Sequence, residues 1–310
     1  MRRPKFQRLE TVTRVAPLGV RFRDVVTDTL IGDGLSVNVY PASSPARRAA
    51  ALANRSGVYV VHHAPGLRAF EQGAGDSAFW ADATTPVPFV VEVEDLERRF
   101  LPFSFVAELP FKGLYNWTSP LDPAPASPPD PPRNVPLDSA PTRRVPAGMA
   151  VVRAELRDPI LDAPAAWAVV EARLEGQMLA RGFSDERGRL ALIFPHPAPL
   201  KFPPVSPPDS PPAAQGPPLM QQEWHVTLSA AYAPQSPPSP PAAEAQAPDL
   251  RATLAQLLTP PADLWLHHGN RVRLTGAVLR YGQELVLQSQ DLDNNSPPAP
   301  ESVLFVTPAP

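Results

Sequence analysis

The chain has 310 residues, enough for about two domains of ordinary size, each with its own hydrophobic core. Its 45 prolines and its 19% of charged residues disfavour a helical protein and favour short strands joined by stiff loops. The net charge is −3 and the arginine pairs are scattered, so the concentrated basic face typical of nucleic-acid binding is missing. We therefore expect a mainly β protein with no nucleic-acid partner.

The sequence contains no cysteine, which excludes disulfides, thiolate nucleophiles, cysteine-ligated zinc and iron–sulfur clusters. Its basic beginning is followed by no apolar run of the kind found in export signals, and no stretch of 18 uncharged apolar residues occurs. We therefore expect no membrane span and a cytoplasmic location.

Three proline-rich stretches divide the chain, at residues 118–147, 197–218 and 234–248. Consecutive prolines favour polyproline II and cannot donate the hydrogen bonds of a central strand. The first stretch is the longest and lies near the middle, so it predicts a linker between an N-terminal domain, residues 1–117, and a C-terminal domain, residues 148–310. The other two stretches are then insertions in the second domain.

Strand patterns fill both halves. In Leu35–Tyr40 apolar residues alternate with polar ones, as in a strand with one buried face. The alanine-rich Pro45–Asn54 predicts one or two helical turns, and Asp249 predicts the N-cap of a short helix that continues to Leu258. Further predicted strands are Gly57–Val61, Phe89–Glu94, Phe103–Leu109, Met149–Leu156, Trp167–Leu174, Arg189–Phe194, Glu223–Tyr232, Arg271–Leu279, Glu284–Gln288 and Val303–Val306.

Two short matches relate the halves to each other. Phe22–Val26 aligns with Leu156–Ile160 around an aspartate, and Arg55–Val60 aligns with Glu186–Ala191 around a glycine. Their order and spacing are similar, which suggests a duplicated module without establishing one.

Residues 150–197 resemble the carboxypeptidase regulatory-like, or transthyretin-like, β-sandwich. The resemblance rests on the strand Ala168–Ala172 and on Ser184–Leu190, which has that family's Ser-Asp-x-x-Gly turn. It implies a small β-sandwich in the C-terminal half. For the whole chain we expect two small β-sandwich domains, transthyretin-like or Ig-like, with proline-rich loops and one short helix. The turn-forming residues around Asp185 and Gly188 predict a structural turn in which Gly188 has a positive φ. The family's Gly-x-Pro-x-x-Gly-Ala segment is missing and is replaced by Asp162–Trp167.

The whole chain also resembles, more weakly, accessory structural proteins of phage-tail-like contractile injection systems. The residues concerned are Asp33–Pro41, Arg55–Val60 and Pro65–Arg68. This resemblance implies a cap, adaptor or baseplate protein whose partners are sheath, tube or baseplate subunits and which is released with the particle. The apolar ends of the chain, Leu18–Val20 and Leu304–Val306, are then expected to add strands to a neighbour's sheet.

No group of residues predicts catalysis, a cofactor or a metal. Adjacent histidines on a strand point to opposite faces, so the pairs His62–His63 and His267–His268 are not expected to chelate a metal. Glu92 and Glu94 are expected on a solvated strand face, and Asp291–Asn295 lacks the glycine and distal glutamate of a calcium loop.

Nucleophile-elbow and phosphate-loop motifs are absent from the sequence. Trp80, Trp117, Trp167, Trp224 and Trp265 are expected to be core or loop anchors. Two functions remain: a non-enzymatic structural subunit of a larger particle, or a stand-alone β-sandwich module that binds a protein or glycan through its loops.

Overall fold

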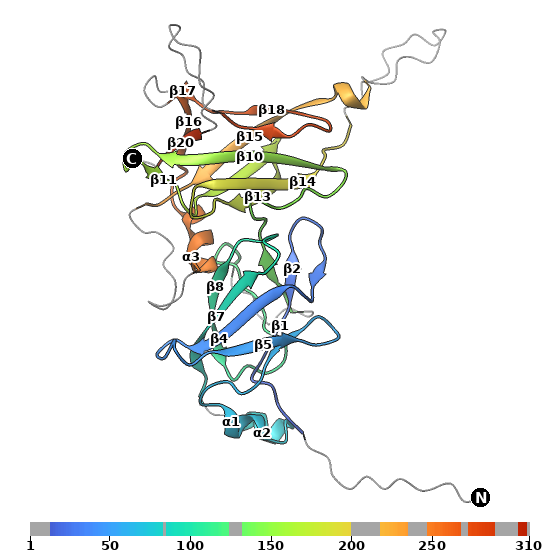
Figure 1. Cartoon of the computed structure of the whole chain (residues 1–310), viewed down its shortest axis with the longest axis vertical. Coiled ribbons are helices and arrows are strands. Elements are labelled where there is room, and N and C mark those ends of the chain that lie inside the picture. Colours follow the sequence, from blue (N-terminus) through green and yellow to red (C-terminus); the bar gives the residue numbers. More distant parts are fainter. Residues whose placement is uncertain are drawn as a thin grey trace, which may run out of the picture.

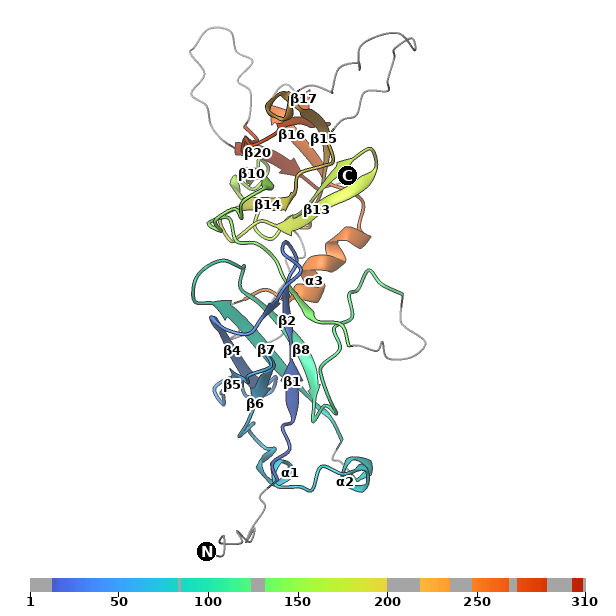
Figure 2. The same ribbon diagram turned by 90° about the vertical axis from the view of Figure 1, so that its right-hand side faces the viewer.

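The computed structural model describes residues 13–82, 85–123, 132–199, 218–234, 247–267, 272–288 and 303–308. It is mainly β, as predicted, and its two β domains lie one above the other along the long axis of the molecule (Figures 1 and 2). Helices α1 and α2 lie at the far end of the N-terminal domain, and α3 lies between the two domains (Figure 2).

The N-terminal domain contains a six-stranded sheet and a small three-stranded one. The large sheet has the order β1 (Leu18–Val20), β6 (Tyr59–Val61), β5 (Ala49–Ala53), β4 (Leu35–Pro41), β7 (Val87–Asp95) and β8 (Phe103–Leu109). The small sheet has the order β3 (Leu30–Ile31), β2 (Phe22–Asp24) and β9 (Val135–Leu137).

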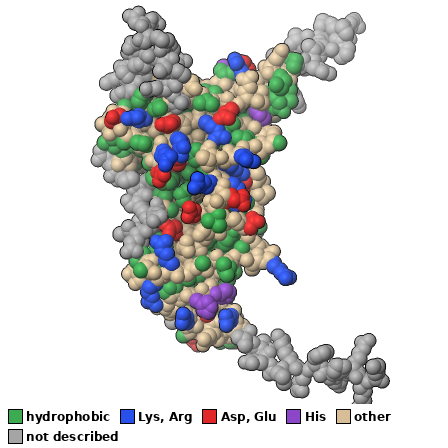
Figure 3. Space-filling view, in the orientation of Figure 1, with side chains coloured by type: hydrophobic (Ala, Val, Ile, Leu, Met, Phe, Trp, Pro, Cys, Tyr) green, Lys and Arg blue, Asp and Glu red, His purple; other side chains and the backbone are tan. Residues whose placement is uncertain are grey.

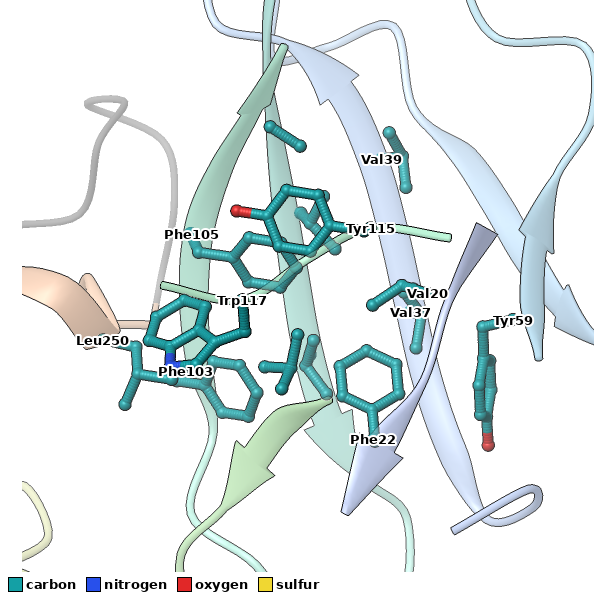
Figure 4. Packing of buried hydrophobic residues seen from close by; sticks show 14 of the residues in the cluster. Val20, Phe22, Val37, Val39, Tyr59, Phe103, Phe105, Tyr115, Trp117 and Leu250 are labelled. Atoms are coloured by element: carbon teal, nitrogen blue, oxygen red, sulfur yellow. The ribbon is translucent and has the colours of Figure 1, made fainter. Parts of the chain in front are cut away.

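Alternation along β4 determines which of its faces is buried. Leu35, Val37 and Val39 are buried, while Ser36 and Asn38 between them are partly exposed. Figure 4 shows Val37 and Val39 on the same side of the sheet as the aromatic rings of the core. The polar–apolar pattern read from the sequence therefore corresponds to the packing of this strand.

The helical turn expected at Pro45–Asn54 is wrong, since this region contains β5. Ala51 is buried and lies opposite both Val37 and Val61 in the antiparallel pairing. Hydrogen bonding to two neighbouring strands outweighs the weak intrinsic preference of alanine for strands. Two helices were not predicted, α1 (Arg68–Glu71) and α2 (Ser77–Ala81).

The C-terminal domain is a sandwich of two sheets that share a buried apolar core. The central strand of one sheet is β10 (Met149–Asp158). On one side it pairs with β14 (Arg189–Pro195) and β11 (Ala163–Pro164), and on the other side with β19 (Leu285–Val286) and β20 (Val303–Thr307). Beyond β20 the sheet continues with β16 (Asp263–His267) and then β17 (Val272–Arg273). The other sheet has the order β13 (Gln177–Phe183), β12 (Val169–Leu174), β15 (Glu223–Ala231) and β18 (Ala277–Arg280).

Both terminal segments that were expected to pair with a neighbouring molecule pair within this chain. β20 lies between β10 and β16, and its residues Leu304 and Val306 are almost completely buried. β1 pairs with β6, and Gly19 also bridges to Leu114. The expected role of these segments in edge pairing is therefore wrong, because their backbone groups already have partners.

The segment predicted as an interdomain linker is partly built into the N-terminal domain. Within residues 118–147, β9 pairs in parallel with β2, and the Ala140 N–H donates to the carbonyl of Arg99. Proline is tolerated here because β9 is an edge strand of three residues. The insertions at 197–218 and 234–248 lie largely outside the described residues.

No helix in the described residues is long and apolar enough to cross a membrane. On the face shown in Figure 3, acidic and basic side chains are interspersed over both domains. This arrangement produces no large surface of one charge sign on that face.

Candidate functional site

The two domains share a hydrophobic core where they meet. Figure 4 shows Leu250, from α3 (Leu250–Ala255), beside Phe103 and Trp117 of the N-terminal domain. Pulling the domains apart would expose this surface to water, at a cost of about 25 cal/mol per Å² of apolar area. The C-terminal residues that belong to the N-terminal core cluster are Val169, Phe183, Ala231, Leu250 and Leu254.

Hydrogen bonds hold α3 against the N-terminal domain. The Ser104 N–H donates to the Pro248 carbonyl at 2.8 Å, and its hydroxyl donates to the Ala247 carbonyl at 2.9 Å. Arg251 donates to the Thr118 hydroxyl at 2.8 Å. Ser104 is completely buried, so these bonds satisfy polar groups that water does not reach.

A buried ion pair fixes the chain segment that follows β9. The Arg143 guanidinium donates to both Asp24 carboxylate oxygens, at 2.8 and 2.6 Å, and to the Ser139 hydroxyl at 3.0 Å. Burial alone would raise the pKa of Asp24, but hydrogen bonds from Arg143, Thr27 and Val26 outweigh it and lower that pKa. The Arg143 carbonyl in turn accepts a bond from Arg153 of the C-terminal domain.

The two residues predicted to form a structural turn, Asp185 and Gly188, lie in a tight turn between β13 and β14. Asp185 Oδ1 accepts from the backbone N–H groups of Arg187 and Arg189, each at 2.9 Å. Its Oδ2 accepts from the Arg189 guanidinium at 3.0 and 2.7 Å. Gly188 has a φ of +78°, and its carbonyl accepts from the N–H of Leu156.

The matched segments of the two halves have similar local hydrogen bonding. Asn54 Oδ1 accepts from the backbone of Ser56 and Val58, and Gly57 has a φ of +69°, as in the Asp185 turn. This first turn joins the neighbouring strands β5 and β6, whereas the Asp185 turn joins strands of two different sheets. The turn is therefore repeated in a different topological position.

A third turn of this type was not predicted, and it follows β7. Asp95 accepts from the backbone N–H groups of Glu97 and Arg99 and from the Arg99 guanidinium. Arg98 occupies the position of the glycine, with a φ of +56°. Burial would raise the pKa of Asp95, but its hydrogen bonds to Arg99 outweigh burial and lower that pKa.

The Asp95 and Asp185 turns line one groove of about 380 Å³ at the domain junction. Both aspartates are already paired with arginines inside their own turns. The remaining charged lining residues, Glu94, Arg98, Glu186 and Arg187, are exposed and balance one another in charge. The groove therefore favours no particular sign of ligand.

A second cavity, of about 560 Å³, also lies between the domains, and we call it the Asp138 cavity. Its polar side chains are Ser119, Asp122, Asp138 and Arg181. Its apolar lining comes from both domains and consists of Val25, Val26, Trp117, Leu121, Pro136, Met178, Leu179, Ala180, Phe183, Ile193, Phe194, Pro195 and Leu254.

Asp138 differs from the other aspartates described at this junction in its raised pKa and in its lack of a hydrogen-bond donor among the described residues. Burial raises its pKa to about 7; the charge of Arg181 opposes that rise and the charge of Asp24 adds to it. Its carboxyl group accepts no hydrogen bond from the described residues, unlike the carboxylates of Asp24, Asp95 and Asp185. Sequence reasoning missed Asp138 because it was read as part of the linker.

The histidine pairs gather no metal ligands among the described residues. His63 has a φ of +59°, and its N–H donates to the carboxylate of the buried Glu71. His267 ends β16, and His268 lies outside the described residues, as does Asp291–Asn295.

Glu92 departs from the prediction that it is solvated. Its carboxylate is largely covered and accepts from Arg48 at 3.0 Å, whereas Glu94 is exposed as expected. The Arg48 guanidinium also lies 4.8 Å from the ring centre of Tyr40, on the same outer face of the sheet. These contacts give Glu92 a structural role.

No family model, curated protein or solved structure matches this chain. The functional argument therefore depends on the geometry of the domain junction.

Proposed function

We propose that this protein is a non-enzymatic structural subunit that acts as a rigid connector in a larger protein assembly. The observation that carries the proposal is the apolar cluster that continues from the core of the N-terminal domain into the C-terminal domain. Domains in one chain usually move relative to each other unless their interface is substantial and hydrophobic. A shared core of this kind favours a fixed angle between the two sandwiches, which suits a protein that holds its neighbours in position.

Exposed apolar residues supply candidate contact points for those neighbours. Ile160 and Leu161 are 70% and 58% exposed in the β10–β11 turn, and Met220, next to β15, is 70% exposed. Adjacent exposed apolar side chains of this kind are common at protein–protein contacts. We therefore propose that the outer turns of the C-terminal sandwich, where these residues lie, bind the neighbouring subunits.

The assembly we propose to test is the contractile injection particle that the sequence resemblance suggests, with this chain as a cap, adaptor or baseplate component. The tagged full-length protein should be recovered with high-mass particles from its native source at a constant stoichiometry, as measured by quantitative mass spectrometry. Leu254→Asp places a charge in the shared core and is expected to reduce particle occupancy at least fivefold.

Leu258→Asp is the matched control, because Leu258 ends the short 3-10 turn Gln256–Leu258 that follows α3 and is 67% exposed. This variant should keep wild-type occupancy, and circular dichroism should show that both variants retain their strands. A wild-type protein found only as a free monomer would contradict the proposal and favour the stand-alone binding module.

A further inference from the structure

The charged groups around Asp138 are already paired with partners of their own. Arg181, on β13, donates to Glu171 at 2.9 and 2.7 Å, and the second oxygen of that carboxylate accepts from Arg173. Asp24, on β2, is paired with Arg143. Among the described residues, no cation forms an ion pair with Asp138 itself.

The remaining lining adds one further carboxyl group, which already has a partner. Asp122 lines the cavity and forms an ion pair with Arg133, and the described lining includes no histidine. The rest of the lining is apolar apart from Ser119, whose hydroxyl accepts from the Leu121 N–H at 3.2 Å. Asp138 is thus one unpaired carboxyl group in a cavity with mainly hydrophobic walls.

We infer that the Asp138 cavity binds a primary ammonium group carried on an aliphatic stem, as in a lysine side chain of a neighbouring subunit. The stem would contact the apolar lining formed by residues such as Met178, Leu179 and Phe183, and the ammonium would donate to the Asp138 carboxylate. The volume of about 560 Å³ lies in the range of small-ligand sites.

An ammonium fits this lining better than a guanidinium does. Arginine has five N–H donors in a planar fork, and the side chains here offer few free acceptors beyond Asp138. A buried guanidinium would leave donors without partners, which is costly. A compact ammonium can direct its charge to one carboxylate while its stem remains in apolar surroundings.

The assignment deepens the proposed connector role, since it names the chemistry of a subunit contact, but its test needs only the isolated protein. The probe is n-hexylammonium, titrated by calorimetry at constant ionic strength, with n-hexanol as the uncharged probe of equal chain length. An ammonium binds the ionised carboxylate, so its affinity should rise about tenfold between pH 6 and pH 8 if Asp138 titrates near 7. Hexanol should show no such rise.

Two matched variants locate the charge. Asp138→Asn should abolish the pH dependence of hexylammonium binding, whereas Asp122→Asn, in the same cavity, should preserve it. In the wild-type protein at pH 7, binding should release about half a proton, measured from titrations in buffers of different ionisation enthalpy. This readout requires no substitution, so a variant that fails to fold leaves the test intact.

The inference would be overturned by equal affinities for hexylammonium and hexanol at both pH values, or by tighter ammonium binding at pH 6. Failure of these titrations together with normal recovery in particles would reject the ammonium site and leave the connector proposal standing. Tight, pH-dependent ammonium binding by a protein with no high-mass fraction would reject the connector proposal and leave the ammonium site standing.

Discussion

Deletion of residues 302–310 is expected to unfold the C-terminal sandwich, because the deleted segment contains β20. This strand lies between β10 and β16, and its loss would leave unpaired the backbone groups with which each of these neighbours bonds to it. It would also remove the buried side chains of Leu304 and Val306 from the core. Circular dichroism should show a marked loss of strand signal, and limited proteolysis should degrade the C-terminal half.

A single substitution tests the packing of β20 in the C-terminal core without removing the strand. Leu304→Ala should lower the free energy of unfolding by about 2 to 5 kcal/mol, the usual cost of truncating a fully buried leucine. Leu258→Ala, the same change at an exposed position, should alter it by less than about 0.5 kcal/mol. Equal melting temperatures for the two variants would show that β20 does not lie inside the sheet.

Gly188→Ala is expected to destabilise the C-terminal domain by about 3 kcal/mol or more. The residue has a φ of +78°, which is unfavourable for any side chain. In addition, an added Cβ would lie 2.2 Å from the carbonyl oxygen of Leu156, so the backbone would have to move. That movement would disturb the 2.8 Å bond from the Leu156 N–H to the Gly188 carbonyl. Urea denaturation of the variant measures the loss.

Gly176→Ala separates the cost of the positive φ from the cost of the close contact with Leu156. Gly176 lies between β12 and β13 with a φ of +82°, and a Cβ there would meet no atom within 4 Å. Its substitution should cost only about 1 kcal/mol, the penalty for the backbone conformation alone. If both glycine variants lose the same stability, the close approach of Gly188 to Leu156 is wrong.

The strands with clear alternation were predictable because burial of one face imposes a period of two on the sequence. β8 was predicted with its observed bounds, and β4 to within one residue. β13 was missed because Gln177–Phe183 has several partly exposed residues and no regular alternation. β9 was missed because its central residue is a proline, which sequence rules place in loops.

The turn formed by Asp185 and Gly188 could be read from the sequence because its hydrogen bonds are local. The Asp95 turn has the same hydrogen bonds but has Arg98 where a glycine would mark the positive φ, so it gave no sequence signal. Asp138 could not be found in this way, because its pKa depends on burial and on Arg181, 43 positions away along the chain. Such groups become recognisable only once the two domains are in contact.

The measurement that tests the rigid junction most directly is the distance between spin labels attached to the two domains. The chain has no cysteine, so labels at Leu52→Cys and Ile160→Cys are unambiguous, and both sites are at least 70% exposed. Electron–electron double resonance should give a single distance distribution as narrow as that of Leu52→Cys with Leu96→Cys, a pair inside the N-terminal domain. A broad or two-peaked distribution across the junction, with a narrow one inside the domain, would contradict the rigid connector.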